Sequence, residues 1–261
     1  MIERIMDIIR EASRLMASPD KIKIMQKGGN ENIVTSSDIA VQDFLRARLA
    51  ELIPDSGFIC EEGDIADVRH SRVWIIDPID GTANYARGVD QCAICVGLCH
   101  EARMEMSVVY LPRTGEMFSA VRGKGAWRNG ERIHVSARSF DDAIMCTALP
   151  VYHKEQAAWC ADAIRDVFMQ CNDIRRLGAA APELCYIAMG RFDMYFEYLL
   201  GAWDFAAASL IVEEAGGVLC NVAGHSLDPM KGSGVIAANS NENLQRLAHI
   251  INSHNPSSRL S

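Results

Sequence analysis

WIIDPIDGTANY, residues 74–85, joins an apolar run to two closely spaced acids. The run Trp74–Ile76 is typical of the end of a strand, and Asp77 and Asp80 follow on a predicted turn that contains a proline and a glycine. Carboxylates this close repel each other unless a cation lies between them. The stretch is therefore either an ordinary turn, since Asp, Pro and Gly all form turns, or one wall of a cation site.

Two further acidic positions have a similar context and favour the cation site. The pair Glu61–Glu62 follows the apolar run GFIC, and Asp204 stands at the start of a predicted helix. Mg²⁺ takes oxygen ligands and typically uses one or two protein carboxylates together with water and substrate phosphate. The turn can aim the carbonyl of Ile79 between the two acids, and the N–H groups of Gly81 and Thr82 can hold a phosphate oxygen.

The composition limits the classes of partner. The chain of 261 residues is 49% hydrophobic and 23% charged, as is usual for a globular protein. Its net charge of −8 disfavours nucleic-acid binding, which calls for a basic surface. No secretory signal is visible, and no apolar run approaches the ~20 residues that span a bilayer. We therefore expect a cytoplasmic protein without a membrane partner.

The nine cysteines are scattered and predict reduced core thiols rather than a disulfide framework. Only Cys92, Cys95 and Cys99 form a cluster, which allows a metal or redox site. Because no second Cys pair or nearby His pair completes a zinc set, a strand of small apolar residues is the preferred interpretation.

Helical and strand-like segments are mixed along the whole chain. Residues 2–17 and about 35–52 have helical patterns, short β-runs fill 57–135, and the second half alternates strands with helices. We expect an α+β or layered α/β architecture. The predicted organisation is one domain over residues 1–261, with an N-terminal half of about 1–140, a C-terminal half of about 141–253 and a frayed tail at 254–261.

WIIDPIDGTANY resembles the signature of the inositol monophosphatase family, a branch of the lithium-sensitive, Mg²⁺-dependent phosphatase superfamily. Four other stretches agree in order and approximate spacing: IVTSSD (33–38), ICEEG (59–63), GKGAWRNGERIHVS (123–136) and WDFAAASLIVEEAGG (203–217). The resemblance implies an αβαβα sandwich of the inositol monophosphatase/fructose-1,6-bisphosphatase type and a homodimer. It also implies hydrolysis of a small polyol phosphate, with inositol 1-phosphate as the first expectation.

The resemblance further implies two Mg²⁺ ions bound by carboxylates and one backbone carbonyl, from Glu61, Asp77, Ile79, Asp80 and Asp204. Asp77 would bridge the ions, with Glu61 and Ile79 on the first and Asp80 and Asp204 on the second. Two metals can stabilise both the attacking and the leaving oxygen of an in-line displacement.

Catalytic roles follow from the same resemblance. Glu61 and Thr82 would position and deprotonate the attacking water, and Asp38 would support Thr82 through a hydrogen bond. The N–H groups of Gly81 and Thr82 would hold the phosphate.

Outer parts of the site are implied in the same way. Glu197 would bind hydroxyl groups of the substrate, with Ala180 as a backbone contact and Asp204 beside them. Glu62 would act through water on a third, weaker ion, and Lys27 lies on the loop expected to close over it.

The chain departs from the family pattern mainly around the polyol pocket. Ala179 stands where the family usually has Ser or Thr, Pro182 falls in the first turn of a predicted helix, and Gly201 replaces a commonly polar residue. Tyr85 stands for the usual Phe. Catalysis is therefore better supported than the identity of the substrate.

Three sister activities remain open: 3′-phosphoadenosine 5′-phosphate phosphatase, fructose-1,6-bisphosphatase and histidinol-phosphatase. The stretch D-G-T-A-N-Y is closer to the inositol type than to the others. A different class is also open, because some bacterial members act through protein or transcription-complex contacts. That class predicts lost ligands or a basic docking patch, whereas the ligand set here is complete and the chain is acidic.

Overall fold

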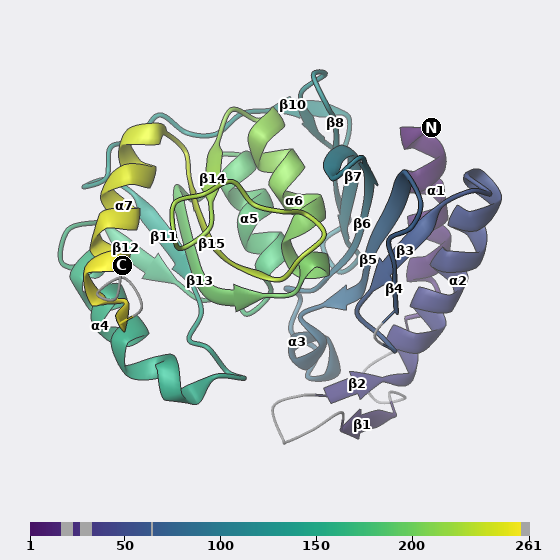
Figure 1. The fold of residues 1–261 in the computed structure, drawn as a ribbon, viewed down its shortest axis with the longest axis horizontal. Helices are drawn as coiled ribbons and strands as arrows, with labels where there is room; N and C mark the ends of the chain where they lie inside the picture. Colours follow the sequence, from purple (N-terminus) through teal and green to yellow (C-terminus); the bar gives the residue numbers. More distant parts are fainter. Residues whose placement is uncertain (17–22, 27–32, 64, 257–261) are drawn as a thin grey trace.

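The computed structural model describes residues 1–16, 23–26, 33–63 and 65–256. Within this part, two large sheets alternate with layers of helices (Figure 1). A short ribbon beside the first sheet pairs β1 (Ile24–Gln26) with β2 (Ile33–Thr35) in antiparallel fashion.

The first sheet has eight strands in the order β10-β9-β8-β7-β6-β5-β3-β4. Their bounds are β3 Gly57–Cys60, β4 Ile65–Asp67, β5 Arg72–Asp80, β6 Ala93–His100, β7 Arg103–Leu111, β8 Glu116–Val121, β9 Ala126–Arg128 and β10 Glu131–Ile133. β3 pairs with β5 in parallel, and the other neighbours are antiparallel.

The second sheet has five strands in the order β12-β11-β13-β15-β14. Their bounds are β11 Ile144–Thr147, β12 Asp173–Arg175, β13 Met194–Leu200, β14 Val218–Cys220 and β15 Ser233–Ala238. β11 pairs in parallel with both β12 and β13, whereas β15 is antiparallel to both of its neighbours.

The helices cover the faces of the two sheets. Their bounds are α1 Ile2–Ser13, α2 Ser36–Leu52, α3 Thr82–Ala86, α4 Ala157–Phe168, α5 Ala180–Ala188, α6 Ala202–Glu214 and α7 Asn241–His254, with a 3₁₀ turn, η2, at Lys154–Gln156. α1 and α2 share an apolar core with the outer face of the first sheet, α5 and α6 lie between the sheets, and α4 and α7 cover the second sheet (Figure 1). This confirms the expected αβαβα layering.

All nine cysteines are free thiols, and all except Cys171 are buried. Burial raises the pKa of Cys92 to about 12 and that of Cys99 to about 11, and it raises the pKa of Cys95 as well. A buried thiol of raised pKa is a poor metal ligand or nucleophile. The cluster therefore packs as core, as the sequence suggested. Among the described helices, none is both long and apolar enough to cross a bilayer.

The start of α2 is built by a reciprocal cap. The hydroxyl of Thr35 accepts a hydrogen bond from the N–H of Ser37 at 3.2 Å, and the Asp38 carboxylate accepts one from the N–H of Thr35 at 2.9 Å. Thr35 is extended, so the chain leaves β2 and enters the helix within one residue. This cap holds Asp38 in the buried layer behind the candidate site.

The prediction that Asp77 and Asp80 lie on a turn is wrong. β5 continues through both residues, and Asp77 pairs with Cys95 while Asp80 pairs with Ala93, so β5 has one extra residue over this interval. In a regular strand, residues three apart point to opposite faces. The extra residue is a bulge that re-aims one side chain, so the two carboxylates share one side. Proline suits such a position because it donates no ladder hydrogen bond.

Two smaller expectations also change. The first helix ends at Ser13 rather than at residue 17, which lies outside the described residues together with 18–22. His254 belongs to α7 rather than to a frayed tail, and it bonds Asp166 at 2.7 Å. The short helix α3 and several three-residue strands had no clear sequence signal.

Candidate active site

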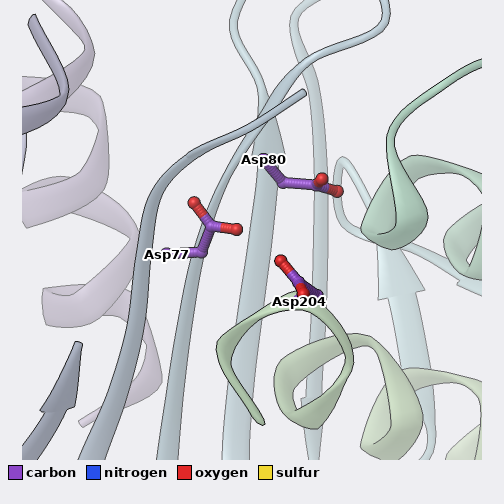
Figure 2. A group of neighbouring side chains, drawn as sticks. All are labelled: Asp77, Asp80 and Asp204. Atoms are coloured by element: carbon purple, nitrogen blue, oxygen red, sulfur yellow. The ribbon is translucent and has the colours of Figure 1, made fainter. Parts of the chain in front are cut away.

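Three aspartates form the centre of the candidate site. Asp77 and Asp80 lie at the end of β5, and Asp204 lies in the first turn of α6. Each offers a carboxylate oxygen, and these oxygens lie within 4.8 Å of one another. Figure 2 shows the three side chains close together, Asp77 and Asp80 on one side and Asp204 on the helix turn that faces them. The strand and the helix are far apart in the sequence, so the cluster exists only in the folded protein.

Asp77 is the most buried member of the cluster and is only half satisfied. Its Oδ1 accepts a hydrogen bond from the N–H of Ile79 at 2.9 Å, whereas Oδ2 is buried and has no hydrogen-bond partner among the described residues. Burial raises the pKa of Asp77 well above its usual value, and the charges of Glu61 and Asp80 raise it further. A buried carboxylate oxygen without a donor requires a cation or a proton.

Asp80 is held by the N-terminus of α5. The N–H groups of Ala180 and Ala181 donate to its two oxygens at 3.3 and 2.6 Å. Burial raises the pKa of Asp80 to about 7, although the bond from Ala181 opposes the shift. Asp204 accepts a hydrogen bond from the N–H of Gly201 at 2.7 Å, and burial followed by the charge of Asp80 raises its pKa strongly.

A cavity of about 870 Å³ opens above the three aspartates. The cavity is lined by nearly all of the site residues predicted from the sequence: Glu61, Asp77, Ile79, Asp80, Gly81, Thr82, Ala180, Glu197 and Asp204. Glu61 lies on the wall outside the tight cluster, where its charge still raises the pKa of Asp77.

Asp38 lies behind the cavity and contacts it through Thr82. Thr82 Oγ1 lies 3.2 Å from Asp38 Oδ1 and 3.0 Å from the carbonyl oxygen of Ile79, so either oxygen can accept its proton. Burial raises the pKa of Asp38, and its bonds with Thr35 oppose that shift. The hydrogen bond predicted between Asp38 and Thr82 is therefore present.

Two outer positions have a different status. Glu62 is buried and its backbone pairs with the side chain of Gln42 at 2.8 and 2.9 Å, and it does not line the cavity in the part of the chain that is described. Lys27 falls outside the described residues. Their proposed link to a third ion stays a prediction.

Glu197, from β13, lines the same cavity, and its charge raises the pKa of Asp80. It accepts a hydrogen bond from the hydroxyl of Tyr195 at 2.5 Å. Burial raises the pKa of Glu197 to about 7, while that hydrogen bond and the charge of Arg176 hold it down. Such a group can bind a substrate hydroxyl either as an acceptor or, when protonated, as a donor.

The departures from the family pattern have local structural reasons. Ala179 gives α5 no side-chain cap, and Asp80 caps the helix instead. Pro182 is the third residue of α5, where its missing N–H leaves no intrahelical bond unmade. A Cβ on Gly201 would meet the ring of Trp203 at 2.5 Å. The hydroxyl of Tyr85 donates to Ser37 at 2.9 Å, which a Phe cannot do.

Gly81 is required by its surroundings. Its φ of +81° lies in the left-handed region, and a Cβ there would lie 2.9 Å from both the Cβ of Ala179 and the carbonyl oxygen of Gln91. The turn that carries the candidate phosphate-binding N–H groups therefore packs directly against the start of α5.

Sequence reasoning missed two residues of the cavity. Glu183 lines it from α5, is 1% exposed, and accepts hydrogen bonds from the N–H groups of Leu177 and Gly178 at 2.5 and 3.1 Å. Burial raises the pKa of Glu183 to about 8. Arg176 lines the cavity next to this loop. The one available signal for Glu183 was a lone acid in an otherwise apolar helix.

The donor set fits a hard divalent cation. Carboxylate oxygens and a carbonyl suit Mg²⁺ rather than a soft metal, which prefers sulfur. The partnerless oxygen of Asp77 and the raised pKa values of Asp77, Asp80 and Asp204 show that the cluster lacks compensating positive charge from the protein itself. A bound cation would supply it.

Comparison with known proteins agrees over nearly the whole chain. The sequence profile of the inositol monophosphatase family matches residues 2–255. Nus factor SuhB of Escherichia coli K12 is 37% identical over 221 residues, which cover 82% of each chain. The IMPase of Thermotoga maritima has a TM-score of 0.85 and 28% identity and covers 95% of both chains. An IMPase/NADP phosphatase complexed with Mg²⁺ and phosphate has a TM-score of 0.82 at 23% identity, covers 92% of this chain and 90% of its own, and shows the same fold. The chain belongs to the inositol monophosphatase family.

Proposed function

We propose that this protein is a Mg²⁺-dependent phosphomonoesterase that hydrolyses a small polyol phosphate, with inositol 1-phosphate as the reference substrate. The observation that carries the proposal is the cluster of Asp77, Asp80 and Asp204 at the floor of an open cavity, with one buried oxygen of Asp77 left without a donor. In a purely structural acid cluster that oxygen too would be paired with an Arg, a Lys or an N–H group.

Five residues would hold Mg²⁺: Glu61, Asp77, Asp80 and Asp204 through carboxylates, and Ile79 through its carbonyl. When bound, Mg²⁺ supplies positive charge that stabilises a phosphoryl group during its transfer and makes water more acidic. The cavity gives a substrate phosphate access to this floor from solvent.

The chain's own part in the reaction is to orient the water and the phosphate. The hydroxyl of Thr82 donates a hydrogen bond to Asp38 or to the carbonyl oxygen of Ile79, so the lone pairs of Oγ1 are left to accept a hydrogen bond from a water. Glu61 lies on the same wall and would hold that water from a second side. The N–H groups of Gly81 and Thr82, at the start of α3, would bind phosphate oxygens.

The polyol would lie on the side of Glu197 and the first turn of α5. Glu197 offers a carboxyl group to the hydroxyls, and Ala180 lies at the same edge of the cavity. A substrate analogue that lacks the hydroxyl would leave the buried carboxyl group of Glu197 unpaired. The pocket would therefore favour polyols over analogues without that hydroxyl.

Phosphate release in Mg²⁺ tests the proposal. The panel is inositol 1-phosphate, fructose 1,6-bisphosphate, 3′-phosphoadenosine 5′-phosphate and histidinol phosphate, each compared by kcat/KM. We expect release that EDTA abolishes and that increasing Li⁺ lowers, since Li⁺ would compete for one cation position. Phosphate release that is unaffected by EDTA would contradict the proposal. A rate that does not fall with increasing Li⁺ would contradict only the predicted inhibition by lithium.

A second candidate function is regulatory protein binding, which the name Nus factor SuhB of the Escherichia coli relative favours. The complete acid cluster argues that this role, if present, is additional to catalysis. An Asp77→Asn variant separates the two, because it should lose phosphate release and keep any protein contact. We also propose a homodimer on the family resemblance, and sedimentation equilibrium tests it.

A further inference from the structure

One basic side chain in the acidic cavity, that of Arg176, differs from the others. Among the described residues that line it, the basic side chains are Arg87, Arg176 and His153, against a floor and wall of carboxylates. Arg176 has no ion pair with any described acid, whereas the adjacent Arg175 is paired with Asp173. The charge of Arg176 is therefore available to a ligand.

Arg176 also occupies a defined place. Its charge acts on Glu197, the proposed contact for the substrate body, whereas no effect of Arg87 on Glu197 is found. Arg176 Nη1 lies 3.6 Å from the position that a Cβ on Gly178 would take. The guanidinium thus lies beside the substrate end of the cavity.

The backbone next to Arg176 is anchored on two sides. The Glu183 carboxylate accepts the N–H groups of Leu177 and Gly178, and the Asn84 amide donates to the carbonyl oxygen of Leu177 at 2.8 Å. Glu183 and Asn84 come from α5 and α3, the two elements that also frame Asp80. The backbone beside Arg176 therefore loses little further freedom when the side chain binds an anion.

We propose that Arg176 determines specificity by binding a second anionic group of the substrate, so that bisphosphates are preferred over monophosphates. This inference rests on the proposed function. The scissile phosphate binds at the carboxylate floor with Mg²⁺, and the second phosphate binds Arg176 at the Glu197 side. Guanidinium matches phosphate geometry with two parallel hydrogen bonds, which Lys or His cannot reproduce.

The alternative physical role for Arg176 is to moderate the charge of Glu197. That role would affect every substrate that uses Glu197, with or without a second phosphate. Loss of charge moderation would therefore lower kcat/KM for all substrates alike, whereas loss of a second-phosphate contact would lower it for bisphosphates and leave the monophosphate nearly unchanged.

The test compares wild type, Arg176→Gln and the matched control Arg87→Gln on inositol 1-phosphate, fructose 1,6-bisphosphate and 3′-phosphoadenosine 5′-phosphate in Mg²⁺. We expect Arg176→Gln to lower kcat/KM for at least one bisphosphate by about 10- to 100-fold, as for loss of a charge-assisted contact, with inositol 1-phosphate changed less than about 2-fold. The bisphosphate affected names the substrate body, a sugar or a nucleoside. Equal losses on all three compounds, no loss on any, or the same selective loss in Arg87→Gln would overturn the inference.

Titration calorimetry of the same compounds in Mg²⁺ measures their binding directly if none of them is hydrolysed. If no ester is hydrolysed, the proposed function fails, and calorimetry then decides the role of Arg176 separately. Tighter binding of a bisphosphate than of inositol 1-phosphate, with the difference removed in Arg176→Gln only, supports the inference. Equal affinities in the wild type and Arg176→Gln contradict it.

Discussion

Replacing Asp80 by Asn should stabilise the metal-free protein while it removes Mg²⁺ binding. Burial raises the pKa of Asp80 to about 7, with the Ala181 N–H opposing and the charges of Glu197 and Glu61 adding to the shift. An unfolded Asp titrates near ~3.9, so ionised Asp80 costs the folded state about 4 kcal/mol. An Asn avoids this cost, but its amide nitrogen accepts no hydrogen bond, so one of the two N–H groups at the start of α5 loses its partner at a cost of about 2 kcal/mol.

The net gain for Asp80→Asn is therefore about 2 kcal/mol, or about 4 °C in Tm for a chain of this size. The pH dependence has a definite sign. Because the folded pKa is the higher one, the cost of Asp80 is absent below about pH 4, develops between about pH 4 and 7, and is complete above pH 7. The variant's advantage should grow over the same window.

The assay is urea and thermal unfolding in EDTA at pH 5 and pH 8, repeated with Mg²⁺ at pH 8. Asp43→Asn, an exposed site on α2 with the same change of charge, is the control. Mg²⁺ should raise the Tm of wild type and of the control, because a ligand of the folded state stabilises it, and should do little for Asp80→Asn. If Asp80→Asn were less stable than wild type in EDTA at pH 8, or gained as much stability from Mg²⁺, Asp80 would be neither a strained carboxylate nor a metal ligand.

Three further variants test other parts of the account. Asp193→Ala removes a fully buried carboxylate that bonds the N–H of Ile144 at 2.8 Å, and urea unfolding should show a loss of about 3–5 kcal/mol. Glu214→Ala frees the N–H groups of Gly123 and Gly125, bonded at 2.7 and 2.8 Å, and should speed their hydrogen exchange at a cost of about 1–2 kcal/mol. Thr82→Val should lower kcat about 100-fold in steady-state assays, with unfolding free energy changed by about 1 kcal/mol.

Long apolar runs and local caps were the parts of the fold that the sequence could predict. The run through Trp74 shows a buried strand, and Thr35 with Asp38 shows a helix start, because both signals are local. Three-residue strands such as β12 have no sequence pattern long enough to detect. They form because a longer neighbouring strand offers free backbone hydrogen-bonding groups along its edge. The bulge at Asp77–Asp80 depends on the register against β6, which no local stretch specifies.

The residues of the candidate site likewise include some that the sequence could predict and some that it could not. The acids of the floor were found because each follows an apolar element, and the family resemblance named their roles. Glu183 and Arg176 were missed because a single charged residue carries no periodicity, and their importance comes from packing. The hydrogen bonds of Asp80 to the start of α5 join segments 100 residues apart in the chain, so only the folded structure shows why Ala179 and Pro182 are tolerated there.

Titration calorimetry of Mg²⁺ into the metal-free protein at pH 7.5, with Asp77→Asn as the comparison, shows whether the aspartate cluster binds the metal. We expect saturable binding to the wild type, with protons released because the raised pKa values of Asp77, Asp80 and Asp204 leave part of the cluster protonated. We also expect Asp77→Asn, with the fold unchanged by circular dichroism, to lose this binding. Equal Mg²⁺ binding by the variant, or none by the wild type, would contradict the assignment of the aspartate cluster as the metal site.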